Sequence, residues 1–140
     1  MNVDKVLLER SLMLVADDDV GLTTDFYDRL FAEHPSARAL FSSDIRPQAR
    51  MLQDAIVAVL DHLEDPTWLR ASLGALGQRH ASWGVTPEMY NWVASTMIAT
   101  MAERGGAEWT DAMTDAWSEA LGAVAGMMLE AYPVRTDGLG

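Results

Sequence analysis

Apolar residues recur along most of the chain at intervals of three and four positions, which is the period of a helix with one buried face. Prolines and glycines divide this pattern into segments. The segments predict six helices, over about 3–16, 26–34, 47–63, 66–80, 87–105 and from 110 to just before Pro133. No segment alternates at a period of two with β-branched residues. The expected fold class is therefore all-α, in a single domain over residues 1–140.

Several of the predicted helix ends carry residues that favour them. The second helix is expected to end near His34, because Pro35 disfavours helical geometry in the residue before it. Asp65 and Pro66 suit the N-cap and the first position of the fourth helix. Thr110 suits the N-cap of the last helix. These signals fix the order of the helices along the chain.

The third and fourth predicted helices each present an apolar stripe with a polar residue at one end. Gln48 begins the third stripe and His80 ends the fourth. Because a short connection returns the fourth helix antiparallel to the third, Gln48 lies about 26 Å and His80 about 21 Å from the turn. The two polar residues are therefore expected at the same open end. The stripes consist of Leu52, Ala55, Ile56, Val59 and Leu63, and of Leu69, Leu73 and Leu76.

A flat, mostly apolar ligand held by one nitrogen suits such an end, and haem matches this description. A histidine at a helix end also has a plain structural explanation, as a cap that interacts with the last carbonyls. Spacing alone leaves both interpretations of His80 open. We expect His34, before Pro35, and His62, among acidic residues, to be solvated surface residues.

Composition and charge narrow the classes of partner. The 140 residues include 10 Lys+Arg and 21 Asp+Glu, giving a net charge of −11, which disfavours nucleic acid and anionic membrane surfaces. With no cysteine, the sequence has no disulfide, no thiol nucleophile and no cysteine-ligated metal site. Histidine remains as the strong nitrogen ligand. Without a signal-peptide core or a long apolar run, a cytoplasmic protein is expected.

Six stretches of the sequence match a known family in their order and spacing. They are FYDRLF at 26–31, ALF at 39–41, the segment from Gln48 to Leu52, LGQRHASWGV at 76–85, PEMY at 87–90 and WTDAMTDAW at 109–117. With these stretches the chain resembles the bacterial single-domain globins and is similar to the globin portion of flavohaemoglobins. The resemblance spans most of the chain and implies a globin fold, with a three-over-three helical sandwich around haem b (iron protoporphyrin IX).

The resemblance implies roles for residues on the two faces of the haem. His80 is implied as the iron ligand, Phe41 as the residue packed on the porphyrin and Leu52 as a restriction on access. Tyr27 and Gln48 are implied as hydrogen-bond donors to a bound diatomic ligand, on which negative charge develops. On the histidine side, the resemblance implies that Trp83 and Val85 line the haem, Tyr90 helps to orient the imidazole and Arg79 pairs with a propionate.

The sequence departs from the family pattern at two places. Where flavohaemoglobins carry a glutamate that completes a hydrogen-bond network with the tyrosine and the histidine, an ungapped match puts Tyr132, and Glu130 is about 200° away around the helix. We therefore do not expect strong imidazolate character at the histidine. Met51 replaces a common basic residue, so propionate anchoring is expected to be weaker or to pass through Arg79 or Arg50.

The implied function is reversible binding of dioxygen, nitric oxide and carbon monoxide, with nitric oxide dioxygenase activity that yields nitrate. Because no G-x-G-x-x-G fingerprint is present, we expect a separate flavin- or NAD(P)H-dependent reductase. One alternative is oxygen storage, delivery or sensing without turnover. Another is a haem-free helical interaction module in which His80 is a cap. A monomer or a homodimer fits each of these.

Overall fold

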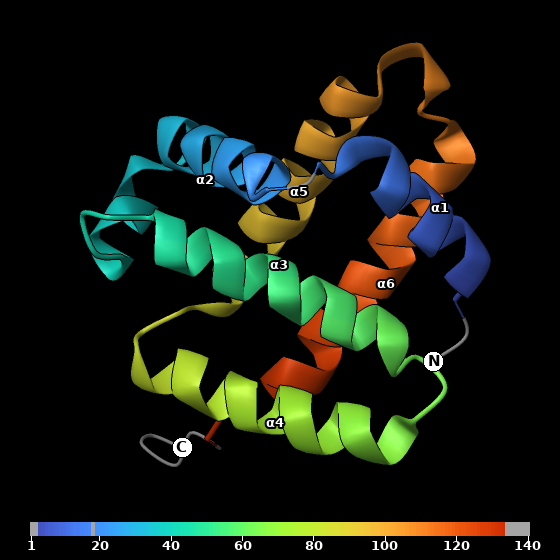
Figure 1. Ribbon diagram of the computed structural model, residues 1–140. Helices are drawn as coiled ribbons and strands as arrows, with labels where there is room; N and C mark the ends of the chain where they lie inside the picture. Colours follow the sequence, from blue (N-terminus) through green and yellow to red (C-terminus); the bar gives the residue numbers. More distant parts are fainter. Residues whose placement is uncertain (1–2, 18, 134–140) are drawn as a thin grey trace.

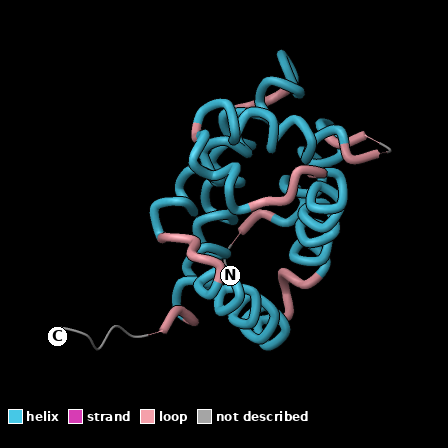
Figure 2. Tube along the Cα trace, turned by 90° about the vertical axis from the view of Figure 1, so that its left-hand side faces the viewer, coloured by secondary structure: helices cyan, strands magenta, loops and turns pink. Residues whose placement is uncertain are grey.

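The computed structural model describes residues 3–17 and 19–133, and its elements within these ranges are helical. Figure 2 shows the helices joined by short loops, without a strand in the part of the chain that is described. This confirms the all-α prediction. The elements are α1 (Lys5–Val15), α2 (Gly21–Glu33), the 3-10 helix η1 (Pro35–Leu40), α3 (Arg46–Asp61), α4 (Pro66–Ser82), α5 (Pro87–Gly105), the 3-10 helix η2 (Gly106–Glu108) and α6 (Asp111–Glu130).

Helix ends agree with the predicted capping residues. The Asp65 side chain accepts the backbone N–H of Trp68 at 3.1 Å, and that of Thr110 accepts the N–H of Met113 at 3.2 Å. Both bonds satisfy a backbone donor that the first helical turn leaves free. Two boundaries differ from the prediction. Helix α2 begins at Gly21, and the segment after Pro35, expected to be a connection, forms η1.

Within the described residues, the α-helices pack most extensively as the pairs α4 and α6, α2 and α5, and α5 and α6. Figure 1 shows α3 and α4 crossing the front of the view in opposite directions. Helix α3 packs chiefly on α2, whereas α4 packs chiefly on α6, so these two antiparallel helices are held by different neighbours. The arrangement leaves room for a site between them, at the end that carries Gln48 and His80.

The buried side chains form two clusters. The larger one joins α1, α2, α3, α5 and α6 around fully buried residues such as Leu8, Phe26 and Met101. Within it the Trp117 indole N–H donates to Ser11 Oγ at 2.7 Å. The smaller cluster consists of Leu69 and Leu73 of α4 with Met128 of α6. On α1, Val6 is 62% exposed, whereas Leu8 and Ser11 are fully buried.

Helix α4 approaches α6 most closely at Gly77. A Cβ at this position would lie 2.1 Å from the Met128 carbonyl oxygen, so only glycine allows the two backbones this separation. His80 lies three residues further along α4.

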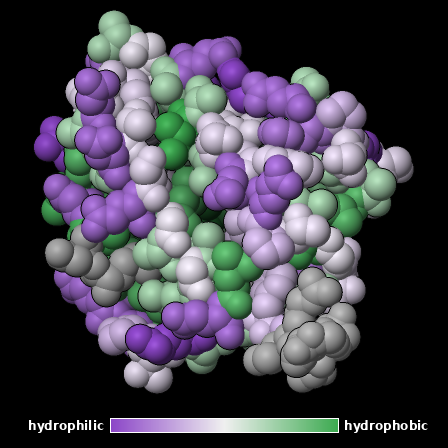
Figure 3. Space-filling model, turned by 180° about the vertical axis from the view of Figure 1, so that it is seen from behind, coloured by the Kyte–Doolittle hydropathy of each residue, from purple (hydrophilic) through white to green (hydrophobic). Residues whose placement is uncertain are grey.

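The face opposite to that of Figure 1 carries a band of hydrophobic atoms between hydrophilic side chains (Figure 3).

Candidate functional site

A cavity of about 320 Å³ lies among α2, η1, α3, the end of α4 and the start of α5. Its lining is mainly apolar, with a few polar groups. It collects six of the residues predicted as site residues, namely Tyr27, Phe41, Gln48, His80, Trp83 and Val85. The others that line it are Phe26, Leu30, Ala37, Leu40, Met89, Trp92 and Val93.

Tyr27 and Gln48 form a hydrogen-bonded pair on one wall of the cavity. The Gln48 Nε2 amide donates to the Tyr27 hydroxyl oxygen at 3.3 Å. Because the amide occupies the oxygen as an acceptor, the phenol proton stays free to donate to a further group. Tyr27 is only 4% exposed, and this burial raises the pKa of its hydroxyl, which keeps the proton in place. The pair can therefore donate hydrogen bonds into the cavity.

An aromatic cluster fixes the orientation of the Tyr27 ring. The ring centroid of Phe41 lies 5.3 Å from that of Tyr27, and Phe31 stacks on Tyr27 at 5.8 Å. Phe41 is held by the loop that follows η1, where the Arg38 guanidinium donates to the carbonyls of Phe41 and Ser42 at 3.2 and 2.8 Å. The rigid placement of these rings limits the positions open to the phenol.

His80 lies in the last turn of α4 and lines the same cavity. Its Nδ1 bonds to the carbonyl oxygen of Leu76 at 2.9 Å, and a carbonyl can only accept. Nδ1 therefore carries the proton, which leaves the lone pair of Nε2 free to bind a metal. Burial lowers the pKa of His80, and the charge of Arg79 acts in the same direction, so the neutral, ligating form is favoured.

The loop between α4 and α5 completes the wall on the His80 side. Gly84 has a φ of +87°, a conformation that glycine adopts without strain, and it turns the chain back toward the cavity. The Val85 N–H donates to the His80 carbonyl at 3.0 Å. Trp83 is 57% exposed, with its ring centroid 5.2 Å from that of His80. Trp83 therefore forms part of the rim, whereas Val85 is half-buried.

Tyr90 lies beside His80, but its hydroxyl bonds elsewhere. The two ring centroids are 6.2 Å apart, and the Tyr90 hydroxyl lies 3.0 Å from that of Tyr132. Tyr132 in turn donates to the Val85 carbonyl at 2.8 Å. Burial, reinforced by the contact with Tyr132, raises the pKa of Tyr90. In this structure the hydrogen bond of the imidazole goes to Leu76, and the orienting role of Tyr90 stays a prediction.

Leu52 and Arg79 do not line the cavity. Leu52 is half-buried and packs on the larger core cluster. Arg79 is exposed on α4. Arg50, considered as an anchor for an acidic group, pairs instead with Asp19 at 3.1 Å. Met51 is 63% exposed. The restriction of access by Leu52 and the anchoring by Arg79 stay predictions.

Sequence reasoning missed part of the lining on α5 and misplaced two histidines. Trp92 lines the cavity, and His34 stacks on it with ring centroids 4.4 Å apart and an interplanar angle of 7°. His62 stacks in the same way on Trp68, at 3.7 Å. Both histidines are half-buried, not solvated as expected. The available signal was the helical spacing of Met89 and Trp92, which puts both on one face.

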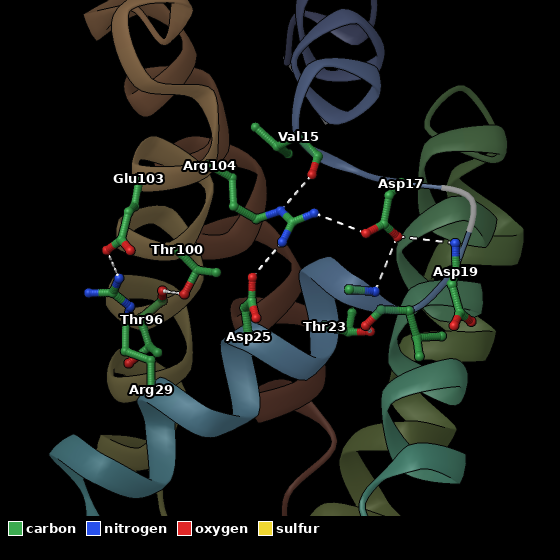
Figure 4. Close-up of polar contacts among 12 residues, drawn as sticks. Val15, Asp17, Asp19, Thr23, Asp25, Arg29, Thr96, Thr100, Glu103 and Arg104 are labelled. Carbon is green, nitrogen blue, oxygen red and sulfur yellow. Dashed lines mark hydrogen bonds and ion pairs between the residues drawn. The ribbon is translucent and has the colours of Figure 1, made fainter.

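A second cavity, of about 360 Å³, lies between α2 and α5 and is lined by charged residues. Figure 4 shows the contacts around it. The Arg104 guanidinium donates to the Val15 carbonyl at 2.7 Å and pairs with Asp17 and Asp25, while Arg29 pairs with Glu103. Both arginines are thus already partnered. The network ties α5 to the connection between α1 and α2.

Two further searches of residues 3–17 and 19–133 bear on the kind of site. No group of three or more histidine and acidic residues is close enough to hold a metal ion. None of the helices in these ranges is long and apolar enough to cross a membrane.

Comparisons with known proteins agree with this geometry. The sequence model of the family described as Globin matches residues 24–128. A flavohemoprotein of Rhizobium meliloti is 30% identical over 135 residues, which cover 91% of this chain and 34% of the relative. A flavohemoprotein of Bordetella pertussis is 28% identical over 128 residues, covering 89% of this chain and 32% of the relative. The chain thus spans about a third of the length of these relatives.

Among solved structures, a bacterial globin from Campylobacter jejuni superimposes with a TM-score of 0.77. The alignment covers 91% of this chain and 92% of that globin, at 19% sequence identity. At this identity the likeness concerns the fold. It agrees with the predicted three-over-three arrangement of helices.

Proposed function

The chain belongs to the globin family, and from this premise we propose that it holds haem b through His80 and reversibly binds dioxygen and other diatomic gases. The single observation that carries the proposal is the cavity with an Nε2 lone pair on one wall and a phenol donor on another. The flavohemoprotein relatives support haem as the cofactor.

The chemistry of the cavity fits a haem group. Its volume of about 320 Å³ lies within the range of roughly 300–1,000 Å³ usual for small-molecule sites. Apolar walls suit the macrocycle, and a neutral imidazole suits the iron. The Leu76 carbonyl fixes the tautomer that leaves Nε2 as the ligand. Haem b suits this sequence better than haem c, because no cysteine is present to form a thioether link.

When bound, haem supplies an iron atom that takes up diatomic gases reversibly. The residues Tyr27 and Gln48 supply the polar wall: the amide donates to the phenol oxygen, and the phenol keeps its proton for a ligand on which negative charge develops. Phe31 and Phe41 pack around the Tyr27 ring on this wall and add apolar surface to it. Phe41 and Trp83 supply flat apolar surface at the edges of the cavity.

The proposed reaction is the oxidation of nitric oxide by dioxygen to nitrate, with one electron supplied per turnover. Donors that hold dioxygen favour this chemistry over simple release. The electron would come from a separate flavin- or NAD(P)H-dependent reductase. The relatives are named flavohemoproteins, and the flavin in that name supports a reductant of this class.

Two measurements test the proposal. The purified protein is expected to show a Soret band, which shifts when carbon monoxide is added to the reduced form. A protein that stays colourless after addition of haemin would reject haem binding and leave the helical interaction module. Stopped-flow mixing of the oxygenated protein with nitric oxide should then yield nitrate and ferric haem rapidly.

Failure to form nitrate in this mixing experiment would leave oxygen storage, delivery or sensing as the function. The neutral acceptor of the His80 imidazole supports this second candidate, because it gives the iron less electron density than a carboxylate partner does. Very slow release of oxygen would then favour sensing over delivery.

A further inference from the structure

The loop after α4 carries two residues of the cavity wall, Trp83 and Val85, and only a few bonds hold it. On one side, the Val85 N–H donates to the carbonyl of His80 at 3.0 Å. On the other side, the Val85 carbonyl accepts the hydroxyl of Tyr132 at 2.8 Å. Tyr132 lies two residues after the end of α6 at Glu130, so this bond ties the loop to the end of a different helix.

The direction of the hydrogen bonds follows from the number of protons. A tyrosine hydroxyl has one proton to donate, and that of Tyr132 is committed to the Val85 carbonyl. In the contact of 3.0 Å between the two hydroxyls, Tyr90 must therefore be the donor. The result is a directed chain from Tyr90 to Tyr132 to Val85. Tyr132 is its hub, since it takes part in both bonds.

We propose that Tyr132 is a positioning residue for the wall on the His80 side: it holds Val85, and with it the loop that follows the iron ligand, and it engages the Tyr90 hydroxyl. The proposal rests on the proposed haem site. It assigns the orientation of the imidazole to the Leu76 carbonyl, which accepts from Nδ1. Tyr90 then supports the loop through Tyr132 and makes no hydrogen bond to His80.

Because the Tyr132 hydroxyl takes part in two hydrogen bonds and that of Tyr90 in one, Tyr132→Phe should loosen the loop more than Tyr90→Phe does. Tyr132→Phe keeps the ring but removes both hydrogen bonds of the hub, including the one to Val85. Tyr90→Phe removes only the outer bond and leaves Val85 held. Each removes a single hydroxyl group, so the pair is matched in chemistry and in side-chain size. Tyr27→Phe makes the same change on the opposite wall and serves as a control.

The first experiment measures haem loss from the holoprotein to an excess of an apo-globin acceptor. We expect Tyr132→Phe to lose haem about fivefold faster than the unchanged protein, and Tyr90→Phe less than about twofold faster. The Raman band of the bond between iron and histidine in the reduced protein should not move in Tyr90→Phe. A loss from Tyr90→Phe as fast as from Tyr132→Phe, or a shifted band in Tyr90→Phe, would overturn the proposal.

The second experiment needs no haem and measures hydrogen exchange of the Val85 amide by NMR. Exchange is expected to be about fivefold faster in Tyr132→Phe and unchanged in Tyr90→Phe and Tyr27→Phe. Unchanged exchange in folded Tyr132→Phe would overturn the positioning role even if haem binds. If neither the unchanged protein nor any of the three variants shows a Soret band, the haem site itself is rejected. The exchange data then still decide whether Tyr132 holds the loop.

Discussion

Replacement of Gly77 by alanine tests the contact that sets the position of α4. The new Cβ would lie 2.1 Å from the Met128 carbonyl oxygen and 2.8 Å from the carbonyl carbon. Ordinary nonbonded contacts lie near 3.5 Å, so the two helices must separate by about 1.4 Å at this contact. Both atoms belong to the backbone and cannot rotate away. Overpacking of this kind costs about 2–3 kcal/mol of the free energy of unfolding.

A loss of this size lowers the melting temperature by roughly 8–12 °C, at about 4 °C per kcal/mol for a chain of this length. Thermal unfolding followed by circular dichroism measures it. Because His80 lies three residues beyond Gly77, haem affinity should fall as well.

Gly74 offers a matched control on the same helix. A Cβ at Gly74 would meet only the Ala131 side chain, at 3.9 Å, which is an ordinary contact. Gly74→Ala is therefore expected to be neutral or to raise stability by up to about 1 kcal/mol, because alanine favours the helix. If Gly77→Ala and Gly74→Ala are equally stable, the reasoning is refuted. The close approach of α4 to α6 at Gly77 would then have no measurable effect on stability.

Three further predictions concern the cavity and the charged network. Tyr27→Phe should speed oxygen dissociation roughly 5- to 100-fold by removing one hydrogen bond to the ligand, whereas Tyr90→Phe should change it less than about twofold in stopped-flow experiments. Burial lowers the pKa of His80 in the folded chain. As the pH falls below about 6.5, this imidazole therefore binds a proton in the unfolded chain before it does so in the folded one. Urea unfolding of the haem-free protein should therefore show stability falling with pH from about 6.5 down to the folded pKa, a step that His80→Gln removes. Arg104→Ala should cost about 2 kcal/mol in urea unfolding, more than Arg29→Ala, because it removes a bond to a backbone carbonyl in addition to ion pairs. Equal losses would show that this carbonyl bond contributes nothing.

Much of the helical framework follows from the sequence, because local signals fix it. The spacing of apolar residues, the caps at Asp65 and Thr110 and the stop before Pro35 act over a few neighbouring positions. The meeting of Gln48 and His80 at one cavity follows as well, since it needs only two antiparallel stripes and the rise of a helix. These predictions use distances along the chain.

The rest of the site depends on contacts between segments far apart in the sequence. Tyr90 and Tyr132 are 42 positions apart, and no local pattern tells that their hydroxyls meet. The stacking of His34 on Trp92 is hidden in the same way, because a histidine before a proline looks like a surface residue until its neighbour is known. Local sequence also does not tell that Leu52 packs on the larger core cluster. Such pairings arise from helix packing.

The small size of the cluster that holds α4 has a consequence for the life of the chain in a cell. Three buried residues, Leu69, Leu73 and Met128, form that cluster, whereas the larger core lies on other helices. Bound porphyrin would therefore complete the packing of α4, and newly made chains that wait for it are expected to open at this helix first. Proteases would cut such chains at α4. The amount of the protein in the cell should then rise and fall with the supply of porphyrin.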